Sequence, residues 1–328
     1  MYYSEYLQLD KVLNAQQRES ERLGRPAHDE MLFIVIHQTY ELWFKQLLFE
    51  VQSVQKLMAG EAINDNGPEL HTISMRLNRV VEILKVLVHQ IDVMETMTAL
   101  DFLDFRDMLR PASGFQSVQF KELEARLGLK MEQRHGKDYY TSQLTAIDKQ
   151  HIENIPVDRS LLELCASWLG RMPFMLELNK ISFWNQYETL YAASLGEGEM
   201  TNLHAFRDMF IEDEMGGSAR LNVHQRRAAL FIMLYRDLPI LQNPFRLLNL
   251  LLEIDEFMAN WRWRHMNMVH RMIGLRTGTG GSSGKGYLRE AAMRHYIFSE
   301  IAELSSFMIE RSKLPKLPDS LISRVNFG

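Results

Sequence analysis

The chain has 328 residues, a formal net charge of −5 and 46% apolar residues, which is enough to bury a large core. Acidic and basic side chains are mixed without a basic stripe, so nucleic acid and an anionic membrane are poor partners. Cys165 is the single cysteine, which excludes an internal disulfide and a cysteine zinc site. An apolar run such as residues 31–36 is far too short to cross a bilayer, and residues 1–5 do not resemble a signal peptide. We therefore expect a soluble, cytoplasmic protein.

Apolar side chains recur at intervals of three and four residues along most of the chain, which is the spacing of helix faces. The spacing predicts helices over residues 9–23, 29–60, 68–91, 101–109, 118–127, 158–170, 223–235, 244–273 and 287–311, with a further helix after Pro173. Residues 129–157 are polar and irregular, and residues 199–219 are expected to form a surface insertion. Because no segment alternates with the period of a strand and no repeat or linker divides the sequence, we predict a single all-α domain over residues 1–328.

The stretch from Trp261 to Arg289 joins the end of a helix to a glycine-rich loop. One face of that helix is apolar except for a histidine; it carries Ile254, Met258, Trp261, His265, Met268 and Met272. Gly274 is expected to end the helix. The histidine therefore lies shortly before residues 278–284, which are all glycine, serine or threonine.

The glycine-rich loop does not match the common phosphate-binding patterns. A dinucleotide fingerprint requires a preceding strand and a glycine at the place of Ser283. A P-loop requires a glycine at the place of Thr279 and a hydroxyl residue at the place of Gly286. Two interpretations remain, a surface connection or a loop that folds over a ligand held near His265.

A second histidine, His37, lies on an equally apolar helix face. That face carries Phe33, His37, Tyr40, Phe44, Leu47 and Val51. Taken alone, His37 is better explained as a core histidine with satisfied hydrogen bonds than as a functional residue. Glu41 is one helical turn away, but no second pair of this kind is present, so we do not expect a carboxylate-bridged metal site.

Two further features have a plain and a functional interpretation. Arg106 follows Phe102 by four residues and would share its helix face, where an arginine usually extends from the edge of a core into solvent. Tyr2, Tyr3 and Tyr6 form an arm before the first predicted helix, and its plain interpretation is a loose terminus whose tyrosines pack on its own body.

Four segments in this order closely resemble the tryptophan 2,3-dioxygenase family, and the resemblance covers nearly the whole chain. They are YSEYLQLD at residues 3–10, FIVIHQTYELW at 33–43, DFR at 104–106 with PASGFQS at 111–117, and WRWRH at 261–265 with GTGGSSG at 278–284 and YLR at 287–289. No position that this family uses for chemistry departs from its pattern. The resemblance implies an all-α fold with haem held between helices and a homotetramer built as a dimer of dimers.

The resemblance also implies an enzyme. Members of this family are ferrous haem b dioxygenases that insert both atoms of O₂ across the indole C2–C3 bond of L-tryptophan. The product is N-formyl-L-kynurenine, and the reaction is the first step of tryptophan catabolism through the kynurenine pathway. Ferrous haem with one histidine ligand leaves the sixth position open for O₂.

The same resemblance assigns roles to individual residues. His265 is expected to be the proximal ligand of the haem iron. His37 is expected to be the distal residue, which accepts a hydrogen bond from the indole N–H and does not act as an obligatory base. Phe33 and Phe102 are expected to form walls of the indole pocket, and Ser113 and Gly114 to border haem and substrate. Arg106 is expected to bind the substrate carboxylate and Thr279 to contact its ammonium group. Residues 1–8 are expected to form an arm that enters the site of a neighbouring subunit and carries Tyr3, Tyr6 and Leu7.

Two alternatives remain. One is a related indole-oxidising haem enzyme with a looser choice of substrate, and the other is a helical protein that binds haem or an indole as a sensor or carrier. Intact Arg106 and Thr279 favour the free amino acid over other indoles, because its two charges need a cation and an acceptor-rich loop.

Overall fold

The computed structural model describes residues 1–60, 67–129, 144–153, 159–172, 174–212, 220–276, 285–319 and 321–322. Its regular elements are all helical within these residues, which confirms the all-α prediction. They are α1 (Tyr3–Tyr6), α2 (Leu9–Val12), α3 (Glu19–Arg22), α4 (Glu30–Met58), α5 (Pro68–Met94), α6 (Ala99–Leu103), η1 (Arg106–Leu109), η2 (Gly114–Gln116), α7 (Val118–Leu127), α9 (Ala146–Glu153), α10 (Leu161–Leu169), α11 (Met175–Lys180), α12 (Phe183–Ser194), α13 (Met200–Phe210), α14 (Val223–Leu234), α15 (Pro239–Ile273), α16 (Lys285–Arg294), α17 (Ser299–Glu303), η5 (Leu304–Phe307) and η6 (Arg311–Lys313).

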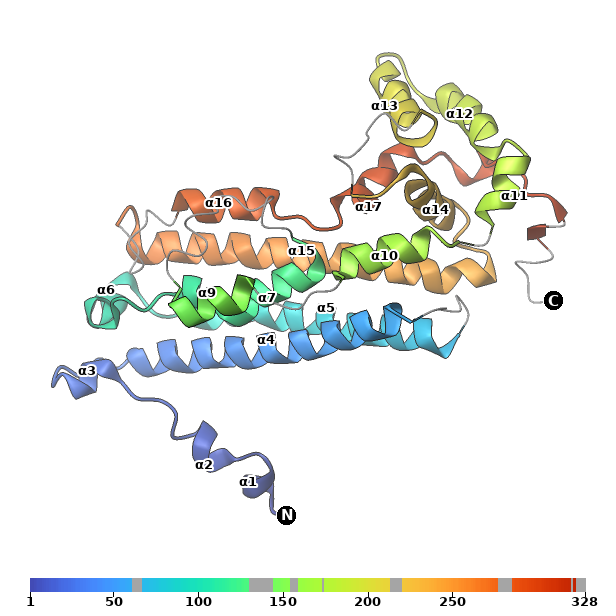
Figure 1. Ribbon diagram of the computed structural model, residues 1–328. Coiled ribbons are helices and arrows are strands. Elements are labelled where there is room, and N and C mark those ends of the chain that lie inside the picture. Colours follow the sequence, from blue (N-terminus) through green and yellow to red (C-terminus); the bar gives the residue numbers. More distant parts are fainter. Residues whose placement is uncertain are drawn as a thin grey trace.

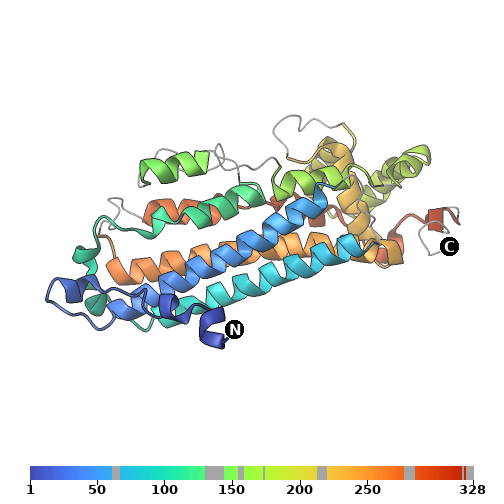
Figure 2. The same ribbon diagram turned by 60° about the horizontal axis from the view of Figure 1, so that its bottom comes forward.

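Three long helices, α4, α5 and α15, lie side by side and form the body of the molecule (Figure 1; Figure 2). Helices α7 and α16 pack along them, and α11 to α14 form a second group of helices at one end. The apolar stripes predicted from sequence face inward, so that Phe44, Leu47, Ile73 and Leu84 are buried in one continuous core. No described helix is both long and apolar enough to cross a membrane.

A smaller apolar cluster lies at the other end of the body, where α4 begins and where α5 and α15 end. Its buried members are Ala27, Ile36, Met94, Met97, Phe105 and Met272. Phe33, Phe102 and Met268 pack against it from α4, α6 and α15. We call this the distal cluster, and it brings together Phe33 and Phe102, two of the predicted site residues.

The long helix α15 begins earlier than predicted. Pro239 occupies its first turn, where proline is well tolerated because its missing N–H is not needed there. Pro244, which was expected to start the helix, lies inside it and is buried. The helix ends at Gly274 with a positive φ of 58°, as the sequence predicts.

The predicted helix over residues 9–23 is wrong, because the structure has only the short helices α2 and α3 there. Most side chains of this segment are exposed. An isolated short helix is only marginally stable in water, so without a surface to pack against the apolar spacing does not suffice. The segment forms an arm that leads away from the body (Figure 1).

The predicted last helix, residues 287–311, is broken after α16 by a contact with a distant helix. The backbone N–H groups of Ile297 and Phe298 donate to the carboxylate of Asp255 on α15, at 2.9 Å for Ile297. These groups are therefore bonded to a side chain and not to a preceding helical turn. Residues 295–298 form a bend, and α17 with η5 follows it.

The predicted surface insertion is wrong for residues 200–210. These residues form α13, whose Leu203, Phe206, Met209 and Phe210 are buried in the core beside α12 and α14. The high content of polar residues around α13 concealed a helix face with regular apolar spacing.

Candidate active site

The distal cluster is built around three phenylalanine rings from separate elements. Phe33 comes from α4, Phe102 from α6, and Phe105 from the turn between α6 and η1. The centroid of the Phe33 ring is 5.6 Å from that of Phe102 and 5.6 Å from that of Phe105, and the Phe102 and Phe105 centroids are 5.4 Å apart. Phe33 and Phe102 were predicted as pocket walls, but Phe105 was not, although its position three residues after Phe102 was the available signal.

His37 belongs to this aromatic group and is held in one tautomer. Its ring centroid is 4.1 Å from that of Phe33. Its Nδ1 is 2.7 Å from the backbone oxygen of Phe33, which can only accept, so Nδ1 carries the hydrogen and donates. Burial lowers the pKa of His37, although the Phe33 carbonyl and Glu41 oppose this shift. The imidazole is therefore neutral at pH 7, and its Nε2 is a hydrogen-bond acceptor.

His265 on α15 is also a neutral imidazole. Burial lowers its pKa to about 4, and the nearby imidazole of His37 adds to the shift. This electrostatic interaction shows that the two histidines, on helices far apart in sequence, approach one common region. Among the described residues, none forms a hydrogen bond with the His265 ring, so neither ring nitrogen is held by a protein partner there.

Arg106 is buried, with 5% of its surface exposed, which contradicts the interpretation that it extends into solvent. The prediction that it shares a helix face with Phe102 is also wrong, because α6 ends at Leu103 and Arg106 begins the 3-10 helix η1. In the chain, Arg106 lies between Phe105 and Leu109, which belong to the distal cluster. A buried guanidinium stays charged and needs hydrogen-bond acceptors, which a carboxylate supplies in two places.

Ser113 and Gly114 begin the short 3-10 helix η2. The Ser113 hydroxyl accepts from the backbone N–H of Phe115, and the Ser113 N–H donates to Gln116 at 3.1 Å. A Cβ at Gly114 would meet no atom within 4 Å, so the backbone at this position is open. The roles of both residues beside haem and substrate stay predictions.

The glycine-rich loop, with Thr279, lies outside the described residues. The described parts of the chain end at Arg276 and resume at Lys285. The predictions of a lid over the ligand and of a contact between Thr279 and the substrate ammonium group concern this segment. Both stay predictions.

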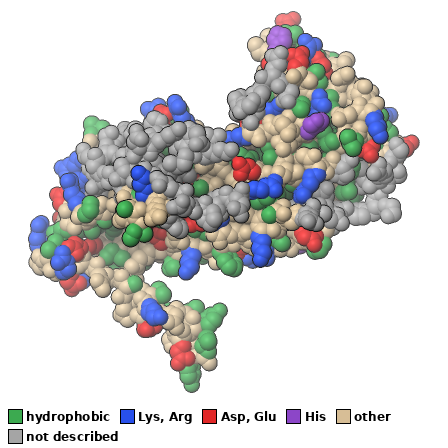
Figure 3. Space-filling view, in the orientation of Figure 1, with side chains coloured by type: hydrophobic (Ala, Val, Ile, Leu, Met, Phe, Trp, Pro, Cys, Tyr) green, Lys and Arg blue, Asp and Glu red, His purple; other side chains and the backbone are tan. Residues whose placement is uncertain are grey.

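The N-terminal arm does not pack on its own body. Tyr3 is 74% exposed and Tyr6 is 72% exposed, and apolar side chains gather at the tip of the arm (Figure 3). This contradicts the interpretation in which the tyrosines pack on the same subunit. The base of the arm is fixed next to His37, because Gln16 donates to the side chain of Gln38 at 2.7 Å.

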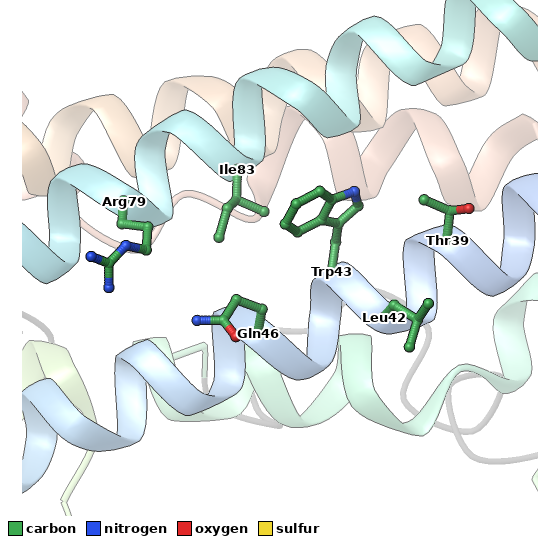
Figure 4. A pocket seen from close by; sticks show the side chains of 6 residues that line it. All are labelled: Thr39, Leu42, Trp43, Gln46, Arg79 and Ile83. Carbon is green, nitrogen blue, oxygen red and sulfur yellow. The ribbon is translucent and has the colours of Figure 1, made fainter. Parts of the chain in front are cut away.

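The groove in Figure 4 lies elsewhere, between α4 and α5. Its lining side chains are Thr39, Leu42, Trp43, Gln46, Arg79 and Ile83, and none of them was predicted as a site residue (Figure 4). Arg79, which supplies its positive charge, forms an ion pair at 2.7 Å with the buried carboxylate of Glu50. The groove is therefore separate from the predicted site residues that the structure describes.

The residues at the distal cluster fit a haem group better than a bare metal ion. A neutral imidazole in apolar surroundings, with its nitrogens not bonded to described residues, is the ligand that a haem iron takes. In the described chain, no three His, Cys, Asp or Glu side chains gather as they would around a bare metal ion.

Comparison with known proteins gives one consistent result. The family model for tryptophan 2,3-dioxygenase matches residues 1–215 and 205–308. A tryptophan 2,3-dioxygenase of Bdellovibrio bacteriovorus is 41% identical over 355 aligned positions, which cover 100% of this chain and 98% of the relative. Enzymes of the same name from Dictyostelium discoideum and Rattus norvegicus are 40% and 39% identical, and the alignments cover 100% and 97% of this chain and 88% and 84% of those relatives.

Proposed function

The chain belongs to the tryptophan 2,3-dioxygenase family, and on that premise we propose that it is a haem dioxygenase that opens the indole ring of L-tryptophan. Both atoms of O₂ enter across the C2–C3 bond, and the product is N-formyl-L-kynurenine. The observation that supports this site best is the approach of two neutral histidines, His37 and His265, from two distant helices beside the aromatic distal cluster.

His265 is the residue that would hold haem b. Its lowered pKa keeps the imidazole neutral, so a lone pair is available to ferrous iron without the loss of a proton. When bound, the haem supplies the oxygen chemistry, while the protein supplies binding, orientation and the exclusion of water. The apolar side chains of Met268 and Met272 on the same helix line this region.

His37 is suited to orient the indole. With Nδ1 donating to Phe33, the neutral ring presents Nε2 as an acceptor for the indole N–H. The same hydrogen bond fixes the orientation of the ring. An indole N–H is a weak acid, and attack on the ring by oxygen does not require its prior removal. We therefore assign His37 an orienting role and not that of an obligatory base.

The remaining groups define the shape and charge of the substrate. Phe33, Phe102 and Phe105 provide aromatic walls that suit a flat apolar ring. Buried Arg106 provides the cation that a free amino acid needs for its carboxylate, and its planar fork fixes orientation as well as position. Thr279, Ser113 and Gly114 complete the site as the family resemblance implies.

We also propose that the active unit is a homotetramer, a dimer of dimers, in the cytoplasm. Residues 1–8 would enter the site of a neighbouring subunit and bring Tyr3, Tyr6 and Leu7 to the substrate. The exposed tyrosines of the protruding arm support this exchange, because isolated aromatic rings gain most from a partner surface.

One assay separates this function from its alternatives. Haem-loaded, reduced protein is mixed with O₂ and either L-tryptophan or an indole without the amino acid group, and product absorbance is followed. We expect rapid N-formylkynurenine formation from L-tryptophan alone. Equal turnover of both compounds would indicate an indole dioxygenase of looser specificity, and binding without product would indicate a sensor or carrier.

A further inference from the structure

The imidazole of His265 lies flat against the indole ring of Trp261. The two rings are offset and parallel, with centroids 5.1 Å apart and planes inclined by only 4°. Both side chains belong to α15 and are separated by one helical turn, so the stack is built into the helix. It is the only ring contact that His265 makes in the described part of the chain.

The indole of Trp261 is itself held by rings from two other helices. Phe120 of α7 lies 4.9 Å from it between centroids, and Tyr40 and Phe44 of α4 meet it edge-on at 6.1 Å and 6.4 Å. Tyr40 is in turn fixed, because its hydroxyl donates to the backbone oxygen of Leu87 on α5 at 2.9 Å. The orientation of Trp261 is therefore set by α4, α5 and α7 together.

A histidine that binds a metal usually donates its second ring nitrogen to a carboxylate, a carbonyl or water, and that bond fixes the plane of the ring. His265 has no such partner among the described residues. Rotation of its imidazole about the bond to Cβ is limited instead by packing against the indole. An aromatic face that is itself clamped can perform the orienting task that a hydrogen bond performs elsewhere.

We propose that Trp261 is the positioning residue of the proximal side and sets the plane of the His265 imidazole against the haem iron. This inference rests on the proposed role of His265 as haem ligand. In this role Trp261 acts on the reaction only through the His265 imidazole on which it stacks. A tryptophan that only fills the core would change stability and leave the iron–imidazole bond as it is.

The chain offers two matched controls for a substitution of Trp261. Trp263 lies on the same helix and is 37% exposed, and Trp168 of α10 is 1% exposed in the main core. Trp263→Leu thus controls for a change on α15, and Trp168→Leu controls for the loss of a buried indole. Trp261→Phe retains a ring face against the imidazole, whereas Trp261→Leu removes it.

The test compares wild type with the variants in two measurements. One is the iron–histidine stretching band of the ferrous, ligand-free holoenzyme, recorded by resonance Raman spectroscopy, and the other is the rate of haem transfer to apomyoglobin. We expect Trp261→Leu to shift and broaden the band and to speed haem loss by about two- to tenfold, the effect of one aromatic pair. Trp261→Phe should lie between Trp261→Leu and wild type, and both controls should keep the wild-type band. If Trp261→Leu does not fold, Trp261→Met takes its place, since methionine fills irregular space without a ring face.

A wild-type band in Trp261→Leu or Trp261→Met would overturn the inference. An equal shift in Trp168→Leu would also overturn it, because the change would then follow from a weakened core. His265→Ala, measured in the same series, tests the underlying assignment. If the band survives in His265→Ala, the proposed ligand is wrong; if it disappears there but is unchanged in Trp261→Leu, only the role of Trp261 is wrong.

Discussion

The substitution Arg106→Leu should remove the preference of the enzyme for tryptophan over tryptamine, which lacks the carboxylate. A charge-assisted hydrogen bond contributes about 1.5–3 kcal/mol, and a two-pronged contact lies at the upper end of that range. Because Arg106 is 5% exposed, solvent screens this interaction little. At 1.4 kcal/mol per tenfold, wild type should prefer tryptophan by about a hundredfold or more in kcat/KM.

The measurement is kcat/KM for both substrates in wild type, Arg106→Leu, Arg106→Lys and a matched control. Arg106→Leu should lose about two orders of magnitude with tryptophan and change little with tryptamine, whose transition state does not use the clamp. Lysine should restore part of the preference, being a point charge without the fork. Arg110→Leu is the control, since Arg110 is exposed and pairs only loosely with Asp107 at 3.4 Å. An unchanged ratio of the two substrates in Arg106→Leu would refute the assignment.

Three further outcomes follow from the site. His37→Ala should keep its haem and lose about threefold to tenfold in kcat/KM, the value of one neutral hydrogen bond of about 0.5–1.5 kcal/mol; complete inactivity with tryptophan bound would instead indicate an obligatory base. The acid limb of the plot of kcat/KM against pH should lie below pH 6.5, because burial lowers the pKa of His37 from 6.5 and the neutral, accepting ring is lost only as pH falls through that lowered value. An acid limb above pH 6.5 that disappears in His37→Ala would show instead that the pKa of His37 is raised. Deletion of residues 1–8 should weaken tryptophan binding and leave haem loading intact, and a truncated enzyme with full tryptophan affinity would exclude the arm from the site.

The long helices could be predicted because their apolar stripes are local in sequence. Pro68 opens α5 as predicted, and Leu77 and Leu87 are buried on its inner face. Where prediction of the helices was wrong, the cause was a contact from elsewhere. The bend after α16 depends on Asp255, 42 residues earlier in the chain than Ile297. Residues 9–23 lack a covering surface within one subunit, so their apolar spacing did not produce a long helix.

The site could be predicted only in part for the same reason. Periodicity placed His37 and His265 on apolar helix faces, but it could not show that the faces meet; the family resemblance supplied that expectation. Burial of Arg106 depends on the break between α6 and η1, which the spacing of Phe102 and Arg106 did not reveal. The stack of Trp261 on His265 follows from their spacing of four, yet its plane is set by Tyr40, Phe44 and Phe120 from other helices.

His265 is the residue that we assign to the haem iron. The haem content and Soret spectrum of purified His265→Ala decide this assignment when they are compared with those of His270→Ala, a control on an exposed side chain of the same helix. We expect His265→Ala to lose most of its haem and His270→Ala to keep a wild-type content and spectrum. Full haem content with an unchanged Soret band in His265→Ala would contradict the account.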